Sequence, residues 1–371
     1  MNTKLRAEHV GSLLRPAPLL RARTDYTEGR ITAAELHSLE DEAIKDAVRR
    51  QRDIGLDIFS DGEMRRASWL TDMAEAVDGF VQQRVMLTWK GPGGGEEAST
   101  ANAVGSRLHK LRKLTGRELP FLGTLAPDGF PISKFKITMP APSNFMLASY
   151  KPGLTDKFYP THSDLLKDVV EIVRDDVEWL VSQGVTYIQF DAPYYSHYLD
   201  PHHRAEMERQ GRNADSELEE GIEADNAAMS PAPRDTVTRA LHICRGNSRS
   251  RWYTEGGYGI IAGRLFGEID MDRFLLEFDD QRSGNFEPLR EVPRGKTVVL
   301  GLVTTKRPAI EWRDVLLRRI EEASRYVPLE DLAISPQCGF ASVAAGNLIT
   351  IDDQWRKLEL VASTAREVWP C

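Results

Sequence analysis

The stretch SDLLKDVVEIVRDDVEWLVSQGVTYIQFDAP, residues 163–193, decides the fold class. Its first part repeats apolar residues at helical intervals from Leu165 to Leu180, with charged residues on the opposite side. After Gly184 the pattern becomes a short apolar-rich run, 187–190, which ends in the polar cluster DAP. A helix followed by a buried strand is the repeating unit of a parallel α/β sheet.

The same alternation recurs along the chain. The apolar runs predict strands at residues 7–12, 57–61, 135–139, 187–190, 239–243, 273–278, 297–303 and 332–335. Helical patterns are clearest at residues 38–54, 163–183, 311–326 and 352–369. Ser163 is the expected N-cap of the second helix, and Gly184 is its expected C′ residue. Eight strands predict a (β/α)8 TIM barrel with insertions, which we expect residues 1–371 to form as one domain.

Two stretches break the repeat: residues 81–130, which contain GPGGGEE, and the polar, acidic residues 201–233. We interpret both as excursions from the barrel, a hairpin and a lid, without firm secondary structure. The glycines of GPGGGEE are not followed by Lys-Ser or Lys-Thr, so they predict a turn and not a phosphate-binding loop.

The composition favours a globular protein with a small-molecule ligand. The chain has 371 residues, of which 41% are hydrophobic and 28% charged, and its formal net charge is −8. This acidic balance argues against a nucleic-acid partner or an anionic membrane surface. Because the first residues lack the apolar core of a signal peptide and no stretch is long enough to span a membrane, we expect a cytoplasmic protein. The oligomeric state stays open, a homo-oligomer included.

Polar clusters follow all eight predicted strands. In chain order they are HVGS, SDGE, TMPAP, FDAP, HICRG, LEFDD, LVTTK and SPQCG. Barrel enzymes build their active sites at the carboxyl ends of the strands. We therefore expect these eight regions to meet at one rim.

Three of these clusters contain residues that can bind a metal: His242, Cys244, Glu277 and Cys338. In His-x-Cys both side chains point to the same side of a strand. Two thiolates, an imidazole and a carboxylate suit Zn²⁺. Such an electron-rich zinc favours activation of a substrate thiol over polarisation of a carbonyl. The alternatives are a structural zinc and separate core or rim residues.

The motifs VGS, IGLDIFSDGE, IQFDAP, HIC, LLEFD, RPAIEW and SPQCGF occur in one order along most of the chain. In this respect the chain resembles the catalytic domain of cobalamin-independent methionine synthase, as a short single-domain member. The resemblance implies that His242, Cys244, Glu277 and Cys338 are zinc ligands. The segment between Cys244 and Glu277 is longer than in that family, which leaves Glu268 as a second candidate.

The resemblance also implies a binding site for homocysteine. The corresponding positions are Gly11, Ser12, Glu63 and Asp191. Two carboxylates can pair with an ammonium group, while Ser12 and backbone N–H groups can bind a carboxylate. A rim ion pair, for example between Glu63 and Arg65, is the structural alternative.

Two positions depart from the family pattern. The proton-donating His of the family corresponds to Val303, and the Trp beneath the pterin corresponds to Phe145 or Met146. Both departures argue against folate as the methyl donor and leave methylcobalamin or another donor.

The expected function is therefore zinc-dependent methyl transfer to homocysteine or a similar small thiol. Two alternatives remain open: alkyl transfer from an epoxide or another electrophile to a different thiol such as coenzyme M, and a non-catalytic corrinoid- or thiol-binding barrel. Tyr194, Tyr195 and His197 follow DAP and are candidates for lining the donor pocket or for packing against the rim. Cys371 is expected to be a free thiol outside the site.

Overall fold

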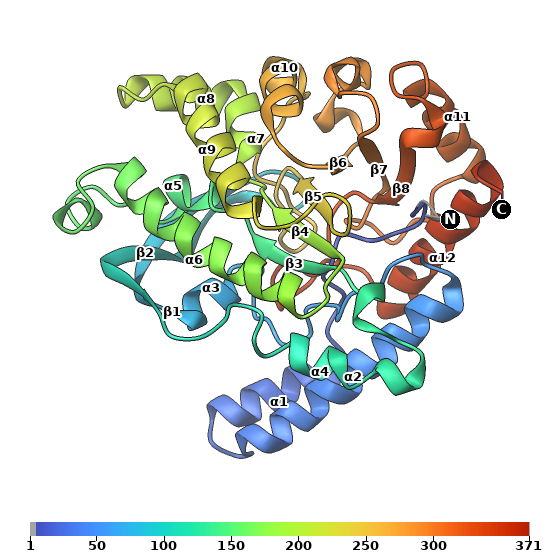
Figure 1. The fold of residues 1–371 in the computed structure, drawn as a ribbon, viewed down its shortest axis with the longest axis horizontal. Helices are drawn as coiled ribbons and strands as arrows, with labels where there is room; N and C mark the ends of the chain where they lie inside the picture. Colours follow the sequence, from blue (N-terminus) through green and yellow to red (C-terminus); the bar gives the residue numbers. More distant parts are fainter. Residues whose placement is uncertain (1–4, 371) are drawn as a thin grey trace.

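A computed structural model of the chain describes residues 5–370. Its centre is a parallel sheet of six strands in sequential order, surrounded by helices (Figure 1). The strands are β3 (Ile137–Pro140), β4 (Tyr187–Asp191), β5 (Thr238–Ile243), β6 (Arg273–Glu277), β7 (Thr297–Val303) and β8 (Leu332–Pro336). All of them lie within one or two residues of the predicted positions.

Two further segments close this sheet into a barrel. Ala7 forms a parallel bridge with Ile334 of β8, and Phe59 forms one with Phe135 just before β3. The backbone N–H of Asp57 donates to the carbonyl oxygen of Ala7, at 3.0 Å, and so joins the two segments to each other. The fold is therefore the expected TIM barrel with insertions.

The first two predicted strands, 7–12 and 57–61, are wrong as regular strands, because side chains replace part of the backbone ladder. Gln51 Oε1 accepts a hydrogen bond from the backbone N–H of Ser60, and Gln51 Nε2 donates to the carbonyl of Ser60, both at 2.9 Å. Asp57 Oδ2 accepts from the backbone N–H of Ala7 at 2.9 Å. These side chains form hydrogen bonds with backbone N–H and carbonyl groups that a neighbouring strand would otherwise bind.

Helices cover the outside of the barrel (Figure 1). The longer ones are α1 (Ala17–Thr27), α2 (Ala33–Ile54), α6 (His162–Ser182), α9 (Ala214–Met229), α10 (Gly259–Glu268), α11 (Arg313–Ala323) and α12 (Ile351–Val368). Thr161 is the N-cap of α6, where its side chain accepts from the N–H of Asp164, so the prediction of Ser163 was wrong. Gly184 has the left-handed φ of 81° expected after this helix.

The two predicted insertions differ from each other in structure. Residues 81–130 contain most of an antiparallel hairpin, β1 (Val77–Trp89) and β2 (Gly95–Lys110), with GPGGGEE at its turn. Residues 201–233 were expected to lack firm secondary structure and instead form α8 (Pro201–Arg209) and α9, which packs against α6. The remaining short helices are α3 (Thr71–Ala76), α4 (Leu119–Gly123), α5 (Asn144–Ala148) and α7 (Tyr195–Leu199).

The barrel interior follows the period of two that strands impose. One buried apolar cluster takes a residue from seven of the eight barrel segments: Val10, Ile58, Tyr187, Ala240, Leu275, Val299 and Ala333. The residue two positions further along each strand also points inward, and it lies closer to the carboxyl end of the barrel. The sequence therefore presents Ser12, His242 and Glu277 toward the barrel axis.

None of the helices in residues 5–370 combines the length and the apolar character needed to cross a bilayer. Cys371 lies outside the described residues.

Candidate metal centre and substrate pocket

Three of the four predicted metal ligands meet at the carboxyl end of the barrel. The ligand atoms of His242, Cys244 and Cys338 all lie within 4.8 Å of one another, and all three residues are buried. His242 belongs to β5, Cys244 follows this strand directly, and Cys338 follows β8. Side chains far apart in the chain thus form one cluster of a nitrogen and two sulfurs.

The hydrogen bonds of His242 leave one ring nitrogen for a ligand. Its Nδ1 lies 3.0 Å from the carbonyl oxygen of Leu275, to which the ring donates when Nδ1 carries the proton. The buried Nε2 has no hydrogen-bond partner among residues 5–370. A backbone carbonyl on one ring nitrogen and an open second nitrogen are the usual arrangement of a metal-binding histidine.

The two cysteines differ in their protonation. A hydrogen bond from Cys338 lowers the pKa of Cys244 well below its usual value, and His242 adds to this effect. The same contact with Cys244 raises the pKa of Cys338. Burial would lower the pKa of His242, but the nearby sulfur of Cys244 raises it. The surroundings of the cluster therefore favour the thiolate form of Cys244 over that of Cys338.

Glu277, the fourth predicted ligand, is not brought into this cluster. It is fully buried, and its Oε1 accepts from Arg282 Nε while its Oε2 accepts from the backbone N–H of Arg245, both at 2.9 Å. These two bonds account for its present position beside the cluster. Glu268 lies at the exposed end of α10, before β6 begins, and is therefore far from the carboxyl ends of the strands.

The loop after Cys244 is held by groups that sequence reasoning missed. Lys306 Nζ donates to the carbonyl of Gly246 at 3.0 Å, to Asn247 Oδ1 at 2.9 Å and to the carbonyl of Arg251 at 3.2 Å. Asn247 Nδ2 donates to the carbonyl of Gly339, next to Cys338, at 2.6 Å. The buried lysine after β7 therefore holds the loop after Cys244, and Asn247 links this loop to the one that carries Cys338. The position of Lys306 in LVTTK, at a strand end, was the available signal.

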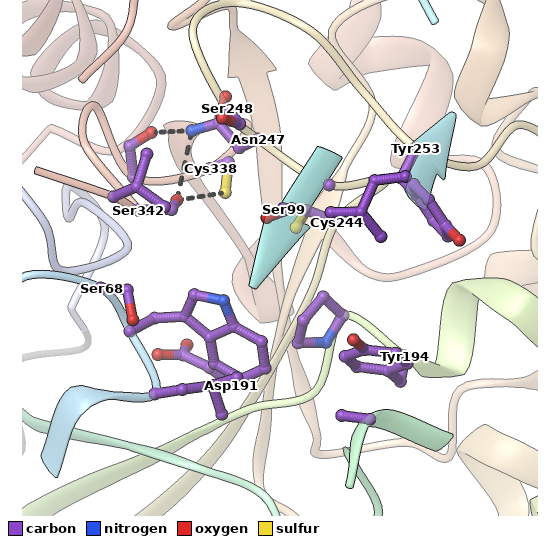
Figure 2. Close-up of a pocket in the computed structure, with 18 of the residues that line it drawn as sticks. Ser68, Ser99, Asp191, Tyr194, Cys244, Asn247, Ser248, Tyr253, Cys338 and Ser342 are labelled. Carbon is purple, nitrogen blue, oxygen red and sulfur yellow. Dashed lines mark hydrogen bonds between the residues drawn. The ribbon is translucent and has the colours of Figure 1, made fainter. Parts of the chain in front are cut away.

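A cavity of about 400 Å³ lies against the metal cluster. Figure 2 shows Asp191 on one side of this pocket and Cys244 and Cys338 on another, with Tyr194 and Tyr253 along its edge. Three of the predicted acceptor residues line the same cavity as the candidate metal ligands: Ser12, Glu63 and Asp191. Its size is at the lower end of the range of small-molecule sites, about 300–1,000 Å³.

Glu63 is held in an unusual backbone conformation with its carboxylate toward the pocket. Its φ is +55°, and its backbone N–H donates to Asp61 Oδ1 at 2.9 Å. Oε1 accepts from Thr138 Oγ1 at 3.2 Å, whereas the buried Oε2 has no partner within the described chain. A Cβ atom at Gly11 would come within 2.6 Å of Glu63 Oε1, so this glycine makes room for the carboxylate. Left-handed backbone at a non-glycine residue is strained and is typical of functional sites.

Asp191 ends β4 and is the register partner of His242 in β5. Its Oδ1 accepts from Gln189 Nε2 at 2.8 Å. Burial raises its pKa to about 7, with a further contribution from Glu63, while His242 acts in the opposite direction. A cationic group bound between Asp191 and Glu63 would stabilise both carboxylates in their charged form.

Aromatic side chains form the rest of the pocket wall. Trp69, Trp89, Tyr194, His197 and Tyr253 all line the cavity. The proposal that Tyr194 and His197 line the pocket therefore agrees with the structure. Tyr195 was a third candidate for this wall, but it is buried and donates to Asp225 Oδ2 at 2.7 Å. Phe145 and Met146, at the family's pterin-stacking position, are also buried and absent from the lining.

The sequence was compared with known families and proteins. The profile described as "Cobalamin-independent synthase, Catalytic domain" matches residues 6–88 and 159–351. The chain belongs to this family. Its membership supports an enzyme of the methyltransferase class, in agreement with the expected family and fold.

Individual relatives extend over nearly the whole chain. The uncharacterized protein YxjG of Bacillus subtilis is 36% identical over 98% of this chain and 94% of its own length. A methionine synthase of Pyrococcus abyssi is 27% identical over 89% of this chain and 84% of its own length. A crystal structure from Listeria monocytogenes, assigned as a vitamin-B12-independent methionine synthase, has a TM-score of 0.72 and 29% identity, with 99% and 98% of the two chains covered.

Proposed function

We propose that this protein is a zinc-dependent methyltransferase that transfers a methyl group to the thiol of homocysteine or a similar small thiol. The observation that carries the proposal is the cluster of His242, Cys244 and Cys338 beside a pocket with two buried carboxylates. Family membership supports the same class of reaction.

The residues present fit a zinc ion. The open Nε2 of His242 and two sulfurs within 4.8 Å of one another are the donor types that zinc prefers. These three residues would hold the metal, which leaves one position of a tetrahedral site for the acceptor. Glu277 is the candidate for that position in the absence of a thiol, and its carboxylate would have to leave Arg282 to reach it.

Zinc bound here would supply a positive charge that keeps the acceptor thiol deprotonated and nucleophilic at neutral pH. The protein's own side chains bind and orient the acceptor. Glu63 and Asp191 would pair with its ammonium group, and Ser12 would contact its carboxylate. The unpartnered Oε2 of Glu63 is the clearest acceptor available for this ammonium.

A matched set of thiols tests this assignment. Homocysteine, 4-mercaptobutyrate, which lacks the amino group, and coenzyme M are titrated into the zinc-loaded protein by calorimetry. We expect homocysteine to bind at least about tenfold more tightly than the other two, because only its ammonium can pair with the carboxylates.

The variant Asp191→Asn should remove much of that preference. Equal binding of all three thiols by the unmodified protein would contradict homocysteine as the acceptor. Preferred binding of coenzyme M, together with product formation from an epoxide, would instead favour the alkyltransferase alternative.

A further inference from the structure

The pocket continues from the acceptor residues along an unbroken arc of aromatic rings. The ring centres of Trp69 and Tyr194 are 6.4 Å apart, and Tyr194 stacks on His197 at 4.7 Å. His197 lies 5.2 Å from Tyr253, which lies 5.9 Å from Trp89. All five rings line the same cavity as the metal cluster, so the arc faces the place where a methyl donor must approach.

Part of this wall lies outside the segments that the family profile matches. The family profile matches residues 6–88 and 159–351, and so stops just before Trp89. The hairpin nevertheless contributes Trp89 and several residues of β2 to the cavity lining. Backbone hydrogen bonds between Lys90 and Trp252, at 2.8 and 3.2 Å, attach the hairpin to the loop that follows Cys244. The side of the pocket opposite the acceptor residues is therefore built partly from residues that the family profile does not match.

Among the described residues of this wall, His197, Tyr194 and Tyr253 are all weak proton donors at neutral pH. Burial lowers the pKa of His197 to about 3, so its ring is neutral. Burial raises the pKa of Tyr194 to about 12, and it also raises the pKa of Tyr253. A methyl donor whose leaving group departs as an anion, such as a deprotonated nitrogen, would need a proton. The three side chains named here are poorly suited to supply it.

We propose that the aromatic arc holds a methyl donor whose methyl group is attached to a positively charged sulfur or nitrogen, an onium compound. This inference rests on the proposed function, because it supplies the donor for the same acceptor. The acceptor thiolate attacks the methyl carbon, a sulfur–carbon bond forms, and the bond from carbon to the onium atom breaks. The electron pair of that bond stays on the onium atom, which departs as a neutral sulfide or amine. No proton has to be donated.

The rings are suited to such a cation. Aromatic faces attract sulfonium and quaternary ammonium groups, most strongly where water is excluded. Arg251 already lies over Trp89, with its guanidinium carbon 5.2 Å from the ring centre, and pairs with Glu97 at 2.6 Å. In the described chain no cationic side chain lies over Trp69, Tyr194 or Tyr253.

A carboxylate on the same donor would also find a partner. Arg249 lines the cavity, is exposed, and has no ion pair with any residue from 5 to 370. Its φ of +51° and that of Ser250, +66°, are maintained by a bond from the backbone N–H of Ser250 to Asn347 Oδ1, at 2.8 Å. The pocket therefore favours a zwitterionic onium donor over one that carries only positive charge.

The first arm of the test measures binding and requires no turnover. Choline and its uncharged isostere 3,3-dimethylbutan-1-ol are titrated into the zinc-loaded protein by calorimetry. We expect choline to bind at least about tenfold more tightly than the isostere, because only choline is attracted by the ring faces. Tyr194→Leu should weaken choline binding by about tenfold, whereas Tyr194→Phe, which keeps the ring, should retain it. Trp312→Leu, which replaces an exposed tryptophan outside the pocket, serves as the control.

The second arm measures methionine formation from homocysteine with S-methylmethionine, glycine betaine or 5-methyltetrahydrofolate. Turnover with an onium donor, inhibited by choline and lost in Tyr194→Leu, supports the inference. Equal binding of choline and the isostere, or turnover with the folate alone, overturns it and leaves the proposed function intact. Binding of choline without methyl transfer to homocysteine from any of the three donors would contradict the proposed function instead.

Discussion

Two polar clusters lie inside the same barrel, and they differ in how completely their groups are bonded. At the amino end of the strands, the Glu8 carboxylate accepts from Lys136 at 2.9 Å, from Tyr187 at 2.8 Å and from Arg273 at 2.6 Å. At the carboxyl end, His242 Nε2 and Glu63 Oε2 are buried without a partner in the described chain. Buried polar groups are normally satisfied, so the first cluster supports the fold and the second is prepared for a ligand.

The largest effect is expected at the carboxyl-end cluster. Cys338→Ala removes one of three metal donors and should reduce methyl transfer to background, at least about a hundredfold. The melting temperature of the metal-free protein should change little, because the side chain lies above the packed barrel. Metal content, transfer rate and a thermal melt test this expectation. A variant that binds zinc and turns over normally would show that the two clusters do not differ in the way proposed.

Substitutions in the amino-end cluster should mainly reduce stability, whereas those in the carboxyl-end cluster should mainly reduce activity. Glu8→Gln leaves Lys136 and Arg273 without their buried carboxylate and should lower the free energy of unfolding by about 3–5 kcal/mol. Tyr187→Phe removes one neutral donor and should cost about 1 kcal/mol. Urea unfolding of the zinc-loaded variants measures both values. A loss below about 1 kcal/mol for Glu8→Gln would mean that this cluster is not structural.

The pH dependence of stability tests whether the amino-end cluster stabilises the fold through the charge of Glu8. Burial would raise the pKa of Glu8, but Arg273 and Lys136 prevail and hold it at about 2 in the folded protein. Because this pKa lies below the usual value of 4.5, the stabilisation is present above pH 4.5 and is lost as the pH falls toward 2. The stability difference between the unmodified protein and Glu8→Gln should therefore shrink over that window. A difference that stays constant down to pH 2 would contradict the role of the charged carboxylate.

A smaller effect is expected where a structural group supports the ligand site. Thr138→Val removes the donor to Glu63 Oε1 and should raise the KM for the acceptor thiol by about three- to tenfold, with little change in kcat. Steady-state kinetics with homocysteine provides the measurement. If kcat falls and KM does not change, Thr138 does not act by positioning Glu63.

The weakest effect concerns the hairpin over the pocket. Arg251 pairs with Glu97 at 2.6 Å, but Glu97 is 45% exposed. Solvent screening limits such pairs to about 0–1 kcal/mol. A double-mutant cycle of Arg251→Met and Glu97→Gln should give a coupling energy in this range. Coupling above about 2 kcal/mol would show that this pair is a third structural cluster.

Much of the barrel, and the meeting of His242, Cys244 and Cys338 at its rim, could be predicted from the positions of residues at strand ends. Alternation along a strand places His242 and Cys244 on one side, and the parallel arrangement brings Cys338 to the same rim. The first two barrel segments were harder to predict, because the side chain of Gln51 replaces a backbone partner at Ser60. Such a substitution depends on tertiary contacts that a local pattern does not contain.

The parts of the site that sequence did not predict depend on long-range partners. Glu277 was predicted as a ligand from its residue type and position, whereas its pairing with Arg282 depends on the loop after β6 and was not predicted. The contribution of Trp89 to the pocket depends on how the hairpin docks onto the loop after Cys244, which no spacing indicates. Trp69 follows the DGE cluster closely, and its position just beyond a strand end was the one available signal.

Zinc X-ray absorption with and without homocysteine tests the central claim most directly. For the zinc-loaded protein alone, the account predicts two sulfur ligands, from Cys244 and Cys338, together with nitrogen from His242 and one lighter atom. After homocysteine binds, it predicts a third sulfur and the loss of an oxygen. A sulfur count that stays at two while homocysteine is bound would contradict the proposal that this metal centre receives the acceptor thiol.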